Sequence, residues 1–341
     1  MEVGEGPMLA TVVPLLNEGK HVGPLLRSLL AQTLAPALHT VVLVDGGSTD
    51  STLDAIETVL ADWSNPLPTV HVLHNPDRTV AHARNMALAM LPPSVEFVVE
   101  LLGHATIEPT HLEQRMTAWR TAEQQSEGPL AGVGCKVEGL EGDQGRVAGW
   151  VDAALASPLG QSDGQFSRFT EPGPTKVPAF VTHRRSALEA VGGWDTALLT
   201  SQDSDLSMRL LKAGYALHRV PSPTVRMARR TTLGKWWKMG HRYGFWRTKV
   251  VLRHPSRLRW VEWLPWVGVL ATAVAYGAGS PLWWLGGALY AAVLFAEGLR
   301  NARSGASFLL GVPFCLMMLH ASFSVGLIDG FLRRGRPASD R

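Results

Sequence analysis

The stretch that most constrains this chain runs from residue 41 to residue 52. It opens with the aliphatic run Val41–Val44, a pattern typical of a strand buried on both faces of a sheet. An acid, two glycines and a cluster of hydroxyl residues follow, and residues 52–60 then carry apolar side chains at helical spacing. The stretch therefore predicts a strand, a tight loop and a helix. In an open α/β sheet such a loop lies at the edge where ligands bind.

The loop after this strand allows two interpretations. In the first, Asp45 hydrogen-bonds a nucleotide, and Gly46 and Gly47 let the backbone approach it closely. In the second, Asp45 caps the following helix and the glycines serve only the turn. The stretch alone leaves both open.

The same alternation of strand and helix patterns continues along the first half of the chain. Apolar runs predict strands at residues 9–14, 69–73, 96–102, 132–137 and 176–182, and helical spacing predicts helices at residues 21–32, 79–91, 111–123, 185–191 and from 202 onward. Residues 139–149 and 157–178 are rich in Gly, Pro, Ser and Asp and predict loops. Strands and helices alternating at this spacing predict an α/β fold with a mostly parallel sheet covered by helices.

Charge and cysteine content exclude some functions. The net charge is only +3 despite a pI near 9.0, which is not a composition that binds nucleic acid. Basic residues cluster between residues 226 and 259, just before an apolar C-terminal third, and this placement favours a membrane surface. Cys135 and Cys315 are the only cysteines, so we expect no structural disulfide and a reducing compartment.

An ordered set of short motifs adds a family resemblance. The set comprises VPLLNE at residues 13–18, VDGGSTDST at 44–52, ARN at 83–85, VGGWD at 191–195 and QDSDLSMRL at 202–210. Residues 9–253 resemble family 2 glycosyltransferases, which have the GT-A nucleotide-sugar fold. Residues 239–246 and the apolar C-terminus resemble the membrane-attached, succinoglycan-type branch, which builds lipid-linked exopolysaccharide repeats.

The resemblance implies a donor site for a nucleotide-sugar. Pro14, Asn17, Glu18 and Asp45 would line its uracil and ribose side, and Arg84 would face the diphosphate, since a guanidinium bridges phosphate oxygens with paired donors. The glycines that the resemblance adds to this site are Gly46, Gly47 and Gly103. The alternative for Arg84 is an ordinary surface arginine on a helix.

The metal position departs from the family pattern. The family usually places Asp-x-Asp there to hold Mg²⁺ or Mn²⁺, and this chain has Leu102, Gly103 and His104. His104 matches the Asp-Gly-His of the succinoglycan-type branch, whereas Leu102 supplies no ligand. Three alternatives stay open: an ion held mainly by the donor phosphates and His104, protein cations in place of the ion, or an inactive site. The alternative for His104 is a loop histidine with no ligand role.

The resemblance also assigns the acceptor side. Sugar transfer with inversion needs one base for the acceptor hydroxyl, and Asp203 occupies the family's position for it, although Gln202 replaces the acid before it. Trp194, Asp205 and Arg242 would lie on the acceptor side. The alternatives are plain packing for Trp194, helix capping for the acids, and support of the helix by Asp205 through the residue four positions on.

The C-terminal third predicts membrane attachment. Residues 261–278 and 282–299 are apolar, each near the length needed to cross, with a turn at 279–281 and tryptophans at the ends. A third segment, residues 307–332, contains Pro313, His320 and Asp329, which favour a re-entrant or interfacial position; whether it crosses stays open. Basic and aromatic residues at 226–260 predict interfacial helices. A soluble helical bundle is disfavoured because so little charge is available to solvate it.

These features predict four parts: a GT-A domain at residues 1–225, interfacial helices at 226–260, a membrane domain of two or three hydrophobic segments at 261–332, and a basic tail at 333–341. We expect a multi-pass protein of the inner (cytoplasmic) membrane with its catalytic domain in the cytoplasm. The predicted function is the inverting transfer of a sugar from a nucleotide-sugar donor to a polyprenyl-linked or other lipid-linked saccharide, in the synthesis of a cell-surface polysaccharide or glycolipid. The resemblance favours UDP over GDP as the nucleotide of the donor. The alternative is a catalytically impaired, nucleotide-sugar-binding scaffold of a membrane complex that assembles polysaccharide.

Overall fold

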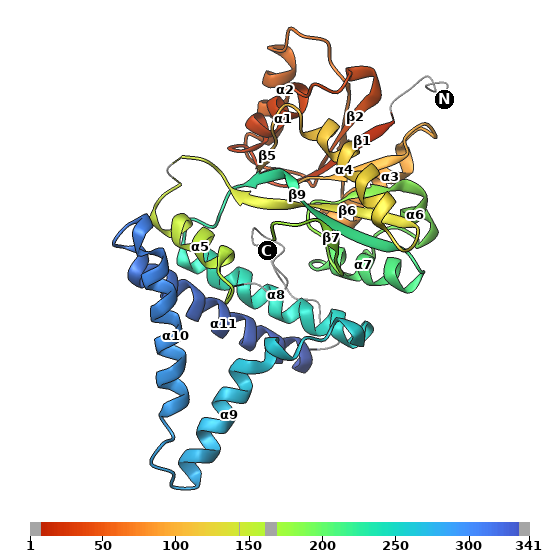
Figure 1. Ribbon diagram of the computed structural model, residues 1–341. Coiled ribbons are helices and arrows are strands. Elements are labelled where there is room, and N and C mark those ends of the chain that lie inside the picture. The colour runs from red at the N-terminus through yellow and green to blue at the C-terminus, as the bar shows by residue number, and fades with distance from the viewer. Residues whose placement is uncertain (1–7, 143, 161–168, 334–341) are drawn as a thin grey trace. The chain divides into compact units, whose positions relative to one another are not determined.

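The computed structural model describes residues 8–142, 144–160 and 169–333 and divides into two compact units (Figure 1). The first unit runs to Leu140 and resumes with Phe169–Ala228, and the second contains Glu141–Arg168 and Arg229–Arg341. The predicted boundary between residues 225 and 226 falls inside the last strand of the first unit. The predicted basic tail, beyond Arg333, lies outside the described residues, as does the part of the predicted 157–178 loop at residues 161–168.

In the part of the chain that the structure describes, the first unit is built on one mixed sheet of nine strands. The strands are β1 (Leu9–Leu15), β2 (His39–Asp45), β3 (Thr69–His74), β4 (Phe97–Glu100), β5 (Ala105–Thr106), β6 (Leu130–Gly139), β7 (Gly173–Pro174), β8 (Thr182–Arg184) and β9 (Ala216–Met227). Their order is β3-β2-β1-β4-β8-β6-β9-β5, with β7 beside β9. The first four positions are parallel, β8 is antiparallel to both neighbours, and β6 and β9 are parallel again.

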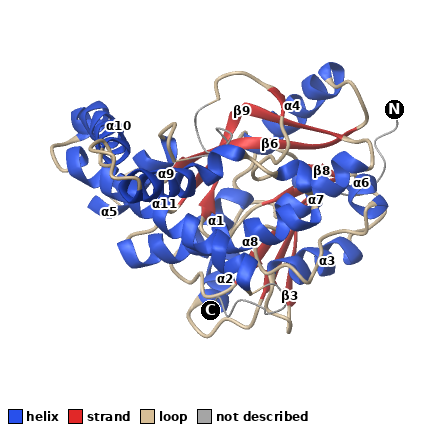
Figure 2. Ribbon diagram, turned by 90° about the horizontal axis from the view of Figure 1, so that it is seen from below, coloured by secondary structure: helices blue, strands red, loops and turns tan. Residues whose placement is uncertain are grey.

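Helices cover both faces of this sheet (Figure 2). Because side chains alternate along a strand, Val41 and Leu43 of β2 belong to one core and Val42 and Val44 to the other. The first core contains residues of α1 (Val22–Leu30), α2 (Thr52–Ala61) and α4 (His111–Gln125), and the second contains residues of α3 (Val80–Met90), α6 (Arg185–Ala190) and α7 (Gln202–Lys212). The predicted helix-covered α/β sheet is confirmed.

The strand order fixes where a ligand can bind. The chain builds β2 and β3 on one side of β1 and then places β4 on the other side. The connections after β1 and β4 therefore diverge, which leaves a crevice at the carboxyl ends of these two strands. The segments after Leu15 and after Glu100 border that crevice.

The long strand β9 was not predicted. Prolines at positions 221 and 223 argue against a central strand because proline cannot donate to a ladder. The structure accommodates them with an irregularity: Cys135 of β6 pairs with Val220, and the next residue, Lys136, pairs with Thr224. The three residues between Val220 and Thr224 leave the ladder and pairing resumes after them. The strand predicted at residues 176–182 is observed slightly later in the chain, as β8 (Thr182–Arg184).

The second unit consists of helices. They are α5 (Arg146–Ala156), α8 (Leu233–Arg253), α9 (Leu264–Gly277), α10 (Leu285–Asn301) and α11 (Phe308–Leu332), joined by 3₁₀ turns at Pro255–Arg257, Trp260–Trp263 and Ala302–Ser304. A 3₁₀ turn at Pro36–Leu38 belongs to the first unit. Helix α5 begins at Arg146, inside the segment of residues 139–149 that was predicted as a loop. Trp236 and Trp246 of α8, expected at a membrane interface, are buried.

The predicted membrane segments correspond to helices of unequal length. Helices α9 and α10 contain 14 and 17 residues, which at a rise of about 1.5 Å per residue is short of a hydrocarbon core about 30 Å thick. Among the described residues only α11 is both long and apolar enough to cross a bilayer. Two full crossings by residues 261–278 and 282–299 are therefore not supported.

Small residues bring α8 and α11 into close contact. A Cβ atom added to Gly244 would lie 2.0 Å from the carbonyl oxygen of Phe323, and one added to Gly326 would lie 2.1 Å from the carbonyl oxygen of His241. The indole Nε1 of Trp236 donates to the carbonyl oxygen of Cys315 at 2.8 Å. The two backbones touch, so even a methyl group at these glycines must separate the helices.

We expect Gly244→Ala to destabilise the second unit by about 1–3 kcal/mol, because the added methyl overpacks this contact. Thermal unfolding of the detergent-purified chain, followed by circular dichroism, measures the change. Gly268→Ala on α9 is the matched control, since a Cβ there meets nothing within 4 Å. Equal melting temperatures for both variants and the parent would show that α8 and α11 are not in backbone contact.

Candidate active site

Two side chains meet across the crevice between β1 and β4. Glu18 comes from the segment after β1 and His104 from the segment after β4, and His104 Nδ1 lies 2.8 Å from Glu18 Oε1. Their side chains are 19% and 18% exposed. A carboxylate only accepts hydrogen bonds, so Nδ1 donates in this contact, and in the neutral ring the lone pair is on Nε2. Gly103 is required here, because a Cβ at that position would lie 2.6 Å from Glu18 Cγ.

The segment after β1 is held by the loop after β2. Asn17 has a left-handed backbone, with φ of 56°. Its backbone N–H donates to Ser48 Oγ at 2.8 Å, and its side-chain oxygen accepts from the backbone N–H of Thr49 at 2.8 Å. The backbone N–H of Glu18 donates to Thr52 Oγ1 at 2.8 Å. These bonds fix the position from which Glu18 reaches His104.

Asp45 shapes the loop that bears it. Its carboxylate is 4% exposed and accepts from the backbone N–H of Gly47 at 2.9 Å, from that of Ser48 at 3.0 Å and from Ser48 Oγ at 2.5 Å. Helix α2 begins at Thr52 after Ser51, so Asp45 is not its cap. Asp45 therefore stabilises the turn and does not cap the helix. Contact of Asp45 with a nucleotide stays a prediction.

The glycines of this loop have structural reasons. Gly47 has φ of 77°, a left-handed conformation that favours glycine. Gly46 donates its N–H to the carbonyl oxygen of Leu15 at 2.9 Å, and a Cβ on it would lie 3.4 Å from Arg78 Cα. Pro14 lies inside β1, beside Val44 of β2. Pro14, Gly46 and Gly47, which were predicted to belong to the donor site, therefore lie at or next to the carboxyl ends of β1 and β2.

A buried charge network lies beneath these loops. Arg84 Nη2 of α3 lies 3.0 Å from Glu100 Oε2 at the end of β4, and the two side chains are 7% and 6% exposed. His183 Nε2 of β8 lies 3.1 Å from Glu100 Oε1. Burial alone raises the pKa of Glu100, but the Arg84 charge and the His183 hydrogen bond outweigh it and hold that pKa below its ordinary value.

This network corrects two predictions. Arg84 was expected to face the donor diphosphate, but its guanidinium is engaged by Glu100 inside the protein and stacks over the ring of Trp194 at 5.6 Å. Trp194 was expected to be an acceptor-side platform, but it is only 2% exposed, so it cannot offer a ring face to a sugar. Packing, the alternative for Trp194, is observed. Asn85 holds its backbone through two hydrogen bonds of 2.9 and 2.8 Å.

The two acids at the start of α7 differ in exposure. Asp203 is exposed, and its Oδ1 accepts from the backbone N–H of Ser204 at 2.8 Å. Asp205 is 2% exposed and accepts from Arg209 Nε at 2.8 Å. Arg209 also donates to the carbonyl oxygens of Val191 and Gly193. Asp205 therefore supports the helix and the preceding turn rather than lining an acceptor site, and Asp203 is the acid that solvent and a substrate can reach.

The residues present fit a divalent ion only in part. Within the described ranges, no three His, Cys, Asp or Glu side chains gather as a metal-binding group, and Leu102 supplies no ligand. The hydrogen bond to Glu18, however, gives His104 the arrangement of a metal-ligating histidine, with one ring nitrogen fixed by a carboxylate and the other available. An ion here would depend on His104 Nε2 and on oxygens brought by the donor.

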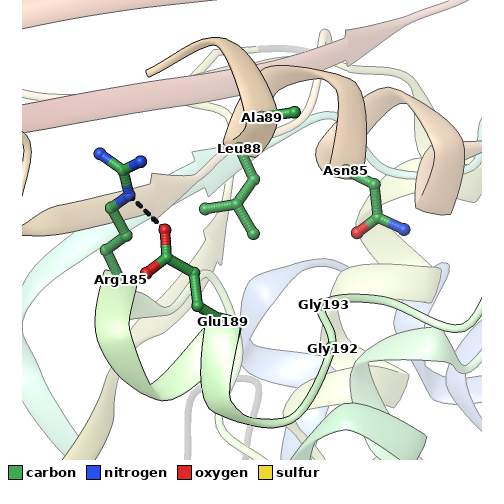
Figure 3. Close-up of a pocket in the computed structure, with 7 residues that line it drawn as sticks. All are labelled: Asn85, Leu88, Ala89, Arg185, Glu189, Gly192 and Gly193. Carbon is green, nitrogen blue, oxygen red and sulfur yellow. Dashed lines mark hydrogen bonds and ion pairs between the residues drawn. The ribbon is translucent and has the colours of Figure 1, made fainter. Parts of the chain in front are cut away.

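The structure also contains a shallow pocket elsewhere on the first unit (Figure 3). Its volume is about 350 Å³, and its polar side chains are already engaged. Arg185 Nε donates to Glu189 at 2.7 Å, and both ends of the Asn85 amide bind the backbone of Trp194. The pocket therefore offers no group for a nucleotide. Arg242 lies on α8 in the second unit, and its acceptor-side role stays a prediction.

Comparison with known proteins agrees with this fold. The family model described as glycosyltransferase like family 2 matches residues 7–244, so the chain belongs to this family and is a glycosyltransferase with the GT-A fold. It is 26% identical over 329 residues to the succinoglycan biosynthesis protein ExoA of Rhizobium meliloti (strain 1021), covering 92% of each chain.

Two further similarities cover nearly the whole chain. A Methanococcus voltae protein, dolichyl N-acetyl-alpha-D-glucosaminyl phosphate 3-beta-D-2,3-diacetamido-2,3-dideoxy-beta-D-glucuronosyltransferase, is 20% identical over 328 residues, covering 95% of this chain and 97% of its own. The structure of the mannosyltransferase PcManGT from Pyrobaculum calidifontis, solved with GDP-Man and Mn²⁺, superposes with a TM-score of 0.63 at 17% identity, covering 98% of this chain and 89% of that one.

Sequence reasoning missed the contribution of Glu100 and His183. Glu100 ends an apolar strand, and an acid in that place is the signal that could have suggested a buried partner. His183 carries no local signal.

We expect Glu100→Gln to lower the free energy of unfolding by about 3–5 kcal/mol, because it leaves the Arg84 charge buried without a carboxylate. The contribution of Glu100 is present above the ordinary carboxyl pKa of 4.5 and is lost as the pH falls through the lower folded-state pKa. Denaturant unfolding at several pH values measures both effects. In the control Glu189→Gln, which breaks an exposed ion pair with Arg185, the loss should stay within about 1 kcal/mol.

We expect Glu18→Gln to weaken Mn²⁺-dependent nucleotide binding by about 10–100-fold, because the amide no longer fixes His104 as a ligand. His104→Ala should remove the metal dependence. Calorimetric titrations with UDP and with GDP, in Mn²⁺ or EDTA, measure both changes, and His71→Ala in the middle of β3 is the control. Binding that is equally strong in EDTA for the parent chain would mean that protein cations, not a metal ion, hold the diphosphate.

Proposed function

We propose that this glycosyltransferase transfers a sugar, with inversion, from a nucleotide-sugar to a lipid-linked saccharide in the synthesis of a cell-surface polysaccharide or glycolipid. The observation that carries the proposal is the Glu18–His104 pair at the crevice between β1 and β4, on the same unit as the exposed carboxylate of Asp203. UDP is our first candidate nucleotide, from the resemblance, and GDP is the second.

The donor would lie along the carboxyl ends of β1, β2 and β4. Asn17 and Asp45 shape the loops on the nucleoside side, and His104 is placed on the side of β4 for the diphosphate. A divalent ion bound there with His104 would neutralise charge on the leaving diphosphate. Because Arg84 is engaged by Glu100, we assign it the role of holding α3 against β4 beneath this site.

Asp203 would act as the base. The acceptor hydroxyl oxygen attacks the anomeric carbon, its proton passes to the Asp203 carboxylate, and the bond from the anomeric carbon to the diphosphate oxygen breaks on the opposite face. Asp203 gains one proton and the leaving nucleoside diphosphate gains one negative charge, so the total charge is unchanged by the step. Asp203 lies in the first turn of helix α7, where the helix macrodipole stabilises a negatively charged side chain.

A lipid-linked acceptor is supported by the chemistry of the second unit and by the relatives. The Methanococcus voltae protein is named for a dolichyl phosphate-linked sugar, and the Rhizobium meliloti protein for succinoglycan biosynthesis. In this chain the second unit contains the apolar helices α9, α10 and α11, which follow a cluster of basic residues, and this arrangement suits attachment to the cytoplasmic face of the inner membrane. Membrane lipid and a lipid-linked saccharide are the partners that we propose.

We expect Asp203→Asn to lower kcat by about 10²–10⁴-fold, because the amide cannot take the proton, while nucleotide binding is unchanged. The assay measures transfer of radiolabelled sugar from UDP-glucose, UDP-N-acetylglucosamine or GDP-mannose into solvent-extractable lipid of membranes that contain the full chain. Asp54→Asn, another exposed acid in a first helical turn, is the control. Turnover near that of the parent would refute the base assignment, and nucleotide binding without any transfer would favour the scaffold function.

A further inference from the structure

Two consecutive residues of α3 contact two different parts of the candidate active site. Arg84 binds Glu100, and the segment that carries His104 begins directly after Glu100. Asn85 binds the backbone of Trp194, 109 positions further along the chain. Both ends of the Asn85 amide are engaged by Trp194, so Asn85 acts on the reaction only through the residues that it holds.

The Asn85 amide fixes the turn that follows α6. Its Oδ1 accepts from the backbone N–H of Trp194 at 2.9 Å, and its Nδ2 donates to the carbonyl oxygen of the same residue at 2.8 Å. The turn has a left-handed backbone at Gly192 and Gly193, with φ of 77° and 70° (Figure 3). A Cβ on Gly193 would lie 2.5 Å from Asn85 Oδ1. The fit is therefore close, and the amide holds the turn against α3 in one conformation.

Helix α7 binds the same turn through Arg209. The Nη1 of Arg209 donates to the carbonyl oxygen of Val191 at 2.7 Å, and its Nη2 donates to that of Gly193 at 2.8 Å. Its Nε donates at 2.8 Å to Asp205, one helical turn earlier, which is 2% exposed. Hydrogen bonds from a charged guanidinium are among the stronger ones in proteins. Three of them join the start of α7 to the turn that Asn85 holds.

The chain between this turn and Asp203 is short and is itself held in place. The backbone N–H of Leu198 donates to the carbonyl oxygen of Asp195 at 3.2 Å, and Leu198 is 1% exposed. The backbone N–H of Asp205 donates to the carbonyl oxygen of Ser201 at 3.1 Å. Asp203 lies between these anchors, in the first turn of α7. A shift of the turn after α6 therefore moves the Asp203 carboxylate.

We propose that Asn85 is a positioning residue for the base: through the turn at residues 191–195 and Arg209, it fixes the place where the Asp203 carboxylate meets the acceptor hydroxyl. The proposal rests on the role of Asp203 in the proposed function and adds the residue that orients it. Because Arg84 and Asn85 are consecutive, α3 holds the segment of His104 and the helix of Asp203 in one frame. A misplacement of about 1 Å lowers a rate by about 10²-fold, so a displacement in which base and leaving group act at one anomeric carbon requires such a frame.

Kinetics of Asn85→Ala in the full chain test the proposal. We expect kcat for sugar transfer to fall about 10–100-fold, while the Kd for UDP or GDP changes less than twofold, because the bond of Arg84 to Glu100 is kept. The control is Gln32→Ala. The Gln32 amide also binds two backbone groups, donating to the carbonyl oxygen of Glu108 at 2.8 Å and accepting from the N–H of Leu112 at 3.0 Å, but it joins the end of α1 to the start of α4. Its kcat should stay within twofold of the parent value, and an equal kcat for both variants would overturn the proposal.

A double-mutant cycle separates positioning of the base from a general loss of structure. Since Asn85 acts through Asp203, adding Asn85→Ala to Asp203→Asn should lower kcat less than twofold further. A loss of folded enzyme would instead lower kcat by the same factor in both backgrounds, and this result would overturn the proposal. Parent-like turnover of Asp203→Asn alone would overturn the base assignment, and the role of Asn85 with it.

A second variant tests the same connection from the side of α7. Arg209→Lys keeps a positive charge beside Asp205 but loses the planar fork that reaches two carbonyl oxygens. We expect kcat to fall about 10–100-fold, again with nucleotide binding within twofold of the parent. This variant keeps the proposal testable where Asn85→Ala does not fold, and a parent-like kcat for Arg209→Lys would overturn it.

Discussion

The ion pair between Arg84 and Glu100 is the interaction on which the catalytic unit most depends. Two charges that are almost fully buried are stable only together, so α3 and the end of β4 must stay in register. His183 extends the pair to β8, and Trp194 packs beneath Arg84. The segment that carries His104 begins directly after Glu100. The position of the candidate metal ligand is therefore set by a charge pair that lies below the site and does not line it.

The loops above this pair form a second layer of constraint. Asp45 organises its own loop, that loop fixes Asn17 and Glu18, and Glu18 fixes the ring of His104. Polar residues that the family pattern assigns to the donor thus already bind one another before any donor is present. Such preorganisation reduces the ordering that binding must impose. It also explains how a site that has lost one acid, with Leu102 in its place, can retain the orientation of the remaining ligand.

In the second unit, the exposure of an apolar helix depends on the helices that pack against it. By length and composition α11 is a candidate membrane span, and α9 and α10 are too short to cross in full. Backbone contact through glycines, however, ties α11 to the basic helix α8. Helix α10 also packs against α11, through Leu294 and the Tyr290–His320 hydrogen bond, whereas no residue of α9 is buried. The packing partners of each helix, in addition to its hydropathy, therefore determine how much of its apolar surface is exposed.

The amino-acid sequence by itself determined the order of strands and helices in the first half, because β2 is an aliphatic run buried on both faces and α1 buries apolar residues at helical spacing. It also indicated the family and the exposed acid Asp203. Tertiary structure decided what depends on partners distant along the chain: the burial of Arg84 and Trp194, the pairing of Glu18 with His104, and the irregular ladder that admits β9 despite its prolines. Local patterns carry no record of such partners, because a long-range contact depends on how the whole sheet brings its strands together.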